Sequence, residues 1–171
     1  GITSRFYQDG EAYMIETDGP TGTMTRYPVH SVVGIEPLQQ YLLETEEGRL
    51  QSFDVAWDAV ENRWYHLYPQ QELLAGDGLH WTGPYKNWNA RCAECHATDF
   101  EKNYTPENRS YASTQAEIGV GCEACHGPGE VHVNWAKKLK TAQAQWTGLT
   151  DVGLTIDMAA RSYNPKCTRE A

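Results

Sequence analysis

Two Cys-x-x-Cys-His motifs constrain this chain more than any other feature of its sequence. Their residues are Cys92, Cys95 and His96 in the first motif and Cys122, Cys125 and His126 in the second. This pattern is the attachment signature of haem c, in which both thiols add to vinyl groups of the porphyrin and the adjacent imidazole ligates the iron. The sequence therefore predicts two covalently attached haems c, with the four cysteines as attachment residues and the two histidines as proximal ligands.

Paired cysteines have two other interpretations. All four thiolates could bind one zinc ion, although the twenty-six residues between Cys95 and Cys122 exceed the usual ribbon loop and zinc requires no His after each pair. A thioredoxin-like redox motif would lie in a βαβ segment, and neither pair has such a pattern around it. Haem attachment is the interpretation that also explains the two histidines.

Two haems leave two more axial positions, and four histidines remain to fill them. His80 precedes the first motif by a stretch long enough to fold over a porphyrin, and His132 follows the second motif past a Gly-Pro-Gly turn. His132 is too near His126 in sequence to bind the same iron, so it would reach a neighbouring haem. His66, at the end of a predicted strand, is the next candidate, and we expect His30 to be structural.

Methionine is the competing sixth ligand and would raise the reduction potential. Met14 and Met24 lie in the predicted strand region, and Met158 is isolated in the sequence. We therefore expect bis-His iron at both centres, with potentials below those of Met/His cytochromes.

Charge and hydropathy limit the possible partners and the possible cellular location of the protein. The formal net charge of −9 makes nucleic acid a poor partner. No apolar run approaches the roughly 18 to 20 residues of a membrane span, and the chain does not open with a secretion signal. Covalent haem attachment in bacteria takes place outside the cytoplasm, so we expect a periplasmic or extracellular protein.

The fold class predicted from the sequence is α+β. Over the first seventy or so residues, runs rich in aromatic and β-branched residues alternate with turn sequences such as QDGE, TDGPTG and TEEGR, which indicates five or six antiparallel strands. In one run Tyr13, Ile15 and Thr17 alternate with Met14, Glu16 and Asp18, as in a half-buried strand. We predict an antiparallel β region at 1–75 and a loop-rich, short-helical haem-binding region at 76–171.

Two helices are predicted in the second region. Thr114 and Glu117 resemble a capping box that would start a short helix over 122–126, ending at Gly127. After that break, apolar residues at helical intervals predict an amphipathic helix, with lysines on its solvated face. The apolar positions are Val131, Trp135, Leu139, Ala142 and Trp146, and the lysines are Lys137, Lys138 and Lys140.

Several runs resemble the multihaem c-type cytochrome family that includes the tetrahaem electron carrier of ammonia oxidisers and haem modules fused to tetratricopeptide repeats. They are GIEPLQQYL, RWYHLYP, LHWTGPYKNWN, CAECHATDFEKNY and CEACHGPGEVHVNWA. The resemblance implies closely packed haems that relay electrons, mostly with two His ligands each. It also implies that His66, His80 and His132 occupy positions where the family carries His. The chain departs from the family by lacking an upstream haem motif and by ending in CTREA from Cys167.

The predicted function is electron transfer, with no catalytic acid or base. An alternative is a nitrite or hydroxylamine-type redox enzyme, which requires a haem with an open coordination site. A second alternative is a subunit of an extracellular cytochrome filament. The expected partners are redox proteins or identical neighbouring subunits. The odd Cys167 either belongs to a longer haem relay that crosses the ends of this chain or is simply a small buried residue or free thiol.

Overall fold

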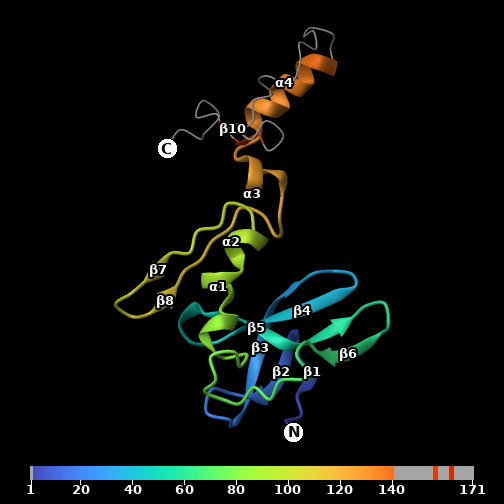
Figure 1. Ribbon diagram of the computed structural model, residues 1–171, viewed down its shortest axis with the longest axis vertical. Helices are drawn as coiled ribbons and strands as arrows, with labels where there is room; N and C mark the ends of the chain where they lie inside the picture. The colour runs from blue at the N-terminus through green and yellow to red at the C-terminus, as the bar shows by residue number, and fades with distance from the viewer. Residues whose placement is uncertain (1, 141–155, 158–161, 164–171) are drawn as a thin grey trace. The chain divides into compact units, whose positions relative to one another are not determined.

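The N-terminal half of the chain forms a six-stranded antiparallel meander (Figure 1). A computed structural model describes residues 2–140, 156–157 and 162–163. The strands pair in chain order, so each hydrogen-bonds to its neighbour in sequence. They are β1 (Arg5–Asp9), β2 (Ala12–Asp18), β3 (Met24–Val33), β4 (Leu38–Glu44), β5 (Leu50–Asp58) and β6 (Arg63–His66). The predicted α+β class and the antiparallel strands of the first seventy residues are confirmed.

Tight turns join these strands because glycine stands where the backbone requires it. Gly10 adopts φ +60° between β1 and β2, a conformation that glycine reaches at little steric cost. Gly34 has φ +88°, and a Cβ there would collide with the carbonyl oxygen of Leu38. A short 3₁₀ turn, η1 (Glu46–Gly48), connects β4 to β5.

The core of the sheet lies on one face and is closed by an aromatic side chain from the loop after β6. Ile15, Leu43 and Phe53 are almost fully buried. Trp81 packs edge-on against Phe53 and Tyr27, with ring centroids 5.5 and 4.8 Å away. Ile15 and Thr17 in β2 are buried as predicted, but the alternation fails at both ends of the strand, where Tyr13 is 65% exposed and Asp18 is buried.

The segment before the first Cys motif is fastened to the sheet by side-chain amides. It runs from Trp81 to Arg91 and includes η2 (Pro84–Lys86) and α1 (Trp88–Arg91). Gln51 donates from Nε2 to the carbonyl oxygens of Trp81 and Gly83, at 3.0 and 2.9 Å. The Asn89 Oδ1 accepts from the Leu50 amide at 2.8 Å, and its Nδ2 donates to the Ser113 hydroxyl at 3.0 Å.

By its internal contacts the chain divides into two compact units. The first comprises residues 1–94 and 101–114, and the second comprises 95–100 and 115–171. The first unit contains the sheet and the hairpin β7 (Tyr104–Thr105) and β8 (Ser110–Tyr111). The boundary predicted near residue 75 rests on a change in composition and differs from this division by contacts. It stays a prediction.

The second unit carries the remaining elements. They are α3 (Cys122–His126), α4 (Glu130–Lys140), β9 (Ile156–Asp157) and β10 (Ser162–Tyr163), while α2 (Ala93–His96) crosses from one unit into the other. No helix of the described residues is both long and apolar enough to cross a bilayer.

The capping box predicted at Thr114 and Glu117 is wrong. Both residues form isolated antiparallel bridges, Thr114 with Glu101 and Glu117 with Thr98. The N-cap of α3 is Gly121, and no side chain caps this helix. Pairing with residues far away in sequence has overridden the local signal.

The end of the short helix and the start of the amphipathic helix agree with the prediction. Gly127 terminates α3 with φ +74°. The amphipathic helix is present as α4 over Glu130–Lys140, with Lys137 and Lys138 exposed. Ala142, Trp146, Met158 and Cys167 lie outside the described residues.

Candidate functional site

Each Cys-x-x-Cys-His motif folds into a short helical turn. The first motif ends in α2, with Cys92 directly before it, and the second forms α3. Residues three and four positions apart lie on the same face of a helix. Both thiols and the histidine of each motif can therefore approach one ligand together.

The chemistry of these side chains fits haem attachment. Among the described residues, no disulfide joins these four thiols to one another; Cys95, Cys122 and Cys125 are exposed and Cys92 is half-buried. Two large apolar side chains just before the second motif, Ile118 and Val120, are 95% and 56% exposed. Accessible thiols beside exposed apolar surface suit a large hydrophobic group bound through two thioether bonds.

His80 is buried in the first unit and is hydrogen-bonded through both ring nitrogens. Its Nε2 lies 2.9 Å from Asp18 Oδ2 and its Nδ1 lies 2.8 Å from the Thr82 hydroxyl. The side chains of His80 and Asp18 are only 4% and 6% exposed. Asp18 ends β2, whereas His80 lies in the loop after β6, so the sheet brings together residues that are 62 positions apart.

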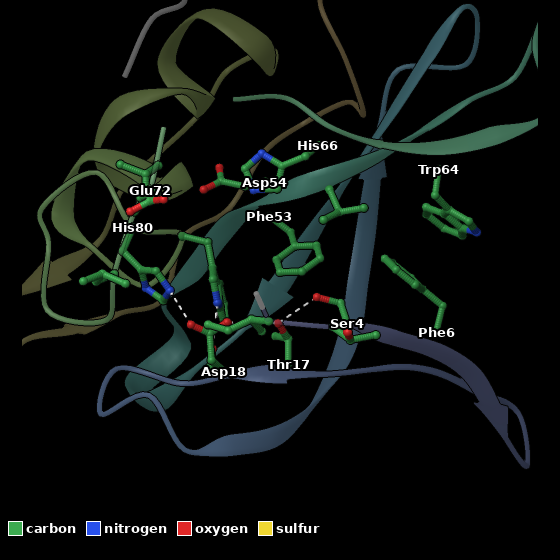
Figure 2. Close-up of a pocket in the computed structure, with 16 residues that line it drawn as sticks. Ser4, Phe6, Thr17, Asp18, Phe53, Asp54, Trp64, His66, Glu72 and His80 are labelled. Atoms are coloured by element: carbon green, nitrogen blue, oxygen red, sulfur yellow. Dashed lines mark hydrogen bonds and ion pairs between the residues drawn. The ribbon is translucent and has the colours of Figure 1, made fainter. Parts of the chain in front are cut away.

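His66 and His80 line one open pocket of about 780 Å³ in the first unit (Figure 2). Four of its sixteen lining residues are aromatic, namely Phe6, Phe53, Trp64 and Trp81. Pockets of this size are typical of small-molecule and cofactor sites. The structure thus places two of the three predicted distal ligands around a single cavity.

The same pocket is rich in carboxylates. Asp18, Asp54 and Glu72 all line it (Figure 2). Burial raises the pKa of the Asp54 carboxyl, and the hydrogen bond and charge of Lys86 oppose that rise. The Lys86 Nζ lies 2.7 Å from Asp54 Oδ1 and 3.7 Å from the centre of the Tyr68 ring. Asp54 is therefore held by a buried ion pair.

The other histidines have separate surroundings. His66 is exposed at the end of β6, and its Nδ1 accepts a hydrogen bond from the Tyr68 amide at 3.0 Å. His132 is half-buried in α4, with its ring stacked on Trp135 at 5.4 Å between centroids. His30 is exposed on β3 beside the Ser31 hydroxyl. His132 belongs to the unit of the second motif, whereas His66 and His80 belong to the sheet unit.

Two residues near the predicted ligands were missed at the level of sequence. Asp18 bonds to His80, and Thr98 bonds to the backbone just before the second motif. An isolated Asp at a strand end or a Thr after a His gives no signal in one sequence, because both partners are distant along the chain.

Comparison with known proteins agrees with the motifs. Residues 63–127 match the family described as cytochrome c554 and c-prime, and this range contains both Cys-x-x-Cys-His motifs. A solved structure of the outer cell wall cytochrome OcwA is similar at 26% identity and a TM-score of 0.36, over 64% of this chain and 20% of that one. The chain thus spans about a fifth of the length of OcwA. No curated protein matches the chain significantly. Residues 63–127, which carry both motifs, are therefore similar to the cytochrome c554 and c-prime family.

Proposed function

We propose that the chain transfers electrons through two haems c. The first would be attached to Cys92 and Cys95, with His96 as proximal ligand. The second would be attached at the other motif, with its thioethers at Cys122 and Cys125 and its proximal ligand at His126. The single observation that carries this proposal is that the residues of each motif form or directly precede a short helical turn, in which positions three and four apart share a face. Bound haem iron supplies the one-electron chemistry by alternating between the ferric and ferrous states.

The chain contributes axial ligands, burial and hydrogen bonds, which together set the reduction potentials. We propose His80 and His132 as the distal ligands, with His66 in reserve. The proposal is supported by the pocket that His66 and His80 share and by the place of His132 in the helix after the second motif. Bis-His ligation leaves no open coordination site, so the protein would act as an electron carrier rather than as a nitrite or hydroxylamine-type enzyme.

Ligation by His80 would require one rearrangement. The His80 Nε2 faces Asp18, while Nδ1 is held by Thr82. A ligand histidine binds iron through one ring nitrogen and keeps a hydrogen bond on the other. Thr82 can supply that second bond if Asp18 releases Nε2.

The proposed location is periplasmic or extracellular, and the proposed partners are redox proteins or identical neighbouring subunits. Covalent attachment of haem c outside the bacterial cytoplasm supports the location. A filament subunit would share this local chemistry and differ only in assembly state.

Denaturing mass spectrometry tests the proposal. We expect the mass of the intact chain plus two haems, which remain bound through acid–acetone extraction because thioether bonds are covalent. The paired variants Cys92→Ala/Cys95→Ala and Cys122→Ala/Cys125→Ala should each retain one haem. Bound zinc alone, or haem that extracts, would overturn the assignment.

A further inference from the structure

Within the second unit, Thr98 connects the segment that follows His96 to the segment that precedes the second motif. It lies two residues after His96 and is 1% exposed. Its hydroxyl donates to the carbonyl oxygen of Gly119 at 3.0 Å and accepts from the amide of Gly121 at 2.8 Å. Gly121 is the N-cap of α3, directly before Cys122. One buried hydroxyl therefore holds the chain that enters the second motif against the chain that leaves the first.

Backbone hydrogen bonds strengthen this junction. Thr98 and Glu117 form an antiparallel bridge, and the Thr98 carbonyl accepts from the Ala116 amide at 3.0 Å. The side chain of Thr98 therefore links two segments that lie 23 positions apart along the chain.

The loop before the second motif is shaped around this hydroxyl. Gly119 adopts φ +88°, which favours glycine. A Cβ on Gly121 would lie 2.7 Å from Glu117 Oε2 and 3.2 Å from the Thr98 hydroxyl. Gly121 lies so close to Thr98 and Glu117 that a larger residue there would displace one of their side chains.

We propose that Thr98 is a positioning residue that fixes the second haem-binding motif relative to His96, and thereby sets the interaction between the two haems. The inference rests on the proposed function, because it requires a haem at each motif. Each haem would be rigid with respect to its own motif through two thioethers and a proximal histidine. A buried hydrogen bond that joins the motifs therefore constrains the separation and orientation of the two groups, as supporting contacts do at other preorganised sites.

The test compares Thr98→Val with Thr98→Ser in the haem-loaded protein. Valine preserves the branched shape but removes the hydroxyl, whereas serine keeps the hydroxyl and should restore the native behaviour. Thr45→Val is the matched control, because the Thr45 hydroxyl bonds to the Arg49 carbonyl at 3.2 Å and touches neither motif.

Two readouts separate positioning from general stability. The Gly121 amide should exchange with solvent about fivefold to tenfold faster in Thr98→Val, which corresponds to the loss of one typical hydrogen bond. The excitonic couplet in the Soret circular dichroism, which depends on the distance and orientation of two haems, should weaken in Thr98→Val and be retained in Thr98→Ser and Thr45→Val.

The outcomes also distinguish this inference from the proposed function. A protein that carries fewer than two haems contradicts the proposed function and the inference built on it. A protein with two haems in which Thr98→Val leaves both the couplet and the Gly121 exchange rate unchanged overturns only the role of Thr98. An equal loss of the couplet in Thr45→Val would also overturn it, because the effect would then follow from lost stability.

Discussion

Lys86 and Asp54 form an ion pair inside the sheet unit, where their side chains are only 10% and 7% exposed. Removing charges from water is costly, and the mutual attraction of the two groups offsets that cost only while both are present. Lys86 also lies over the Tyr68 ring, so its ammonium group has two stabilising partners. The pair joins β5 to the segment before the first motif.

Substitution of Lys86 should therefore destabilise the fold strongly. Lys86→Met leaves a buried carboxylate unpaired, and we expect a loss of about 3–5 kcal/mol in the free energy of unfolding. Lys102→Met, at an exposed lysine, is the matched control. Denaturant unfolding of the haem-loaded protein at pH 7 measures the difference, and equal stability of the two variants would contradict this account of the pair.

The same variant has a predictable pH dependence. Burial raises the pKa of Asp54 and Lys86 lowers it, so the pKa rises further once Lys86 is removed. A carboxyl whose pKa is higher in the folded than in the unfolded protein stabilises the fold while it is protonated. This stabilisation is complete below the unfolded-state pKa of roughly 3.9 and is lost as the pH rises through the folded-state pKa. The deficit of Lys86→Met relative to the native chain should therefore be smaller at pH 5 than at pH 7.

At the scale of elements, α1 shows how four residues can be held in a helix before a haem motif. Isolated helices of this length do not form in water. Asn87 caps α1 by accepting from the Ala90 amide at 2.8 Å, and Asn89 ties it to β5 through Leu50. Cys92 follows as the C-cap. Side-chain amides, rather than helix propensity, set where the first thiol lies.

Loss of the cap should be measurable. Asn87→Ala removes the acceptor for the Ala90 amide, and we expect a loss of about 1 kcal/mol in the free energy of unfolding. Asn87→Ser keeps an oxygen at the cap without burying a charge and should restore most of that stability. Thermal or denaturant unfolding of the three proteins compares them, and a fully stable Asn87→Ala variant would show that the tertiary bonds of Asn89 alone hold α1.

Elements whose signals are local were predicted from the sequence, and those that depend on distant partners were not. The strands of the sheet follow from runs of aromatic and β-branched residues between glycine-containing turns. The short helix at the second motif was also predicted, but its capping box was wrong because Thr98 and Glu101 pair with Glu117 and Thr114. The hairpin β7–β8 was missed, since two-residue strands carry no periodic signal.

At the scale of the whole molecule, some candidate site residues could be predicted from a local motif, whereas others depend on contacts that form only in the folded chain. The four thiols and two histidines proposed to hold the haems are predicted from their spacing alone. The distal side does not, because the Asp18 partner of His80 lies 62 positions away and the pocket shared with His66 exists only once the sheet has formed. The choice among His66, His80 and His132 therefore stays a prediction from the sequence and the family.

The absorption spectrum of the oxidised and reduced protein tests the central claim most directly, because it reports haem content and spin state together. The account predicts two low-spin, six-coordinate haems c per chain, with His80→Ala and His132→Ala each converting one haem to the high-spin form. A high-spin signal in the resting native protein, or unchanged spectra in both variants, would contradict it.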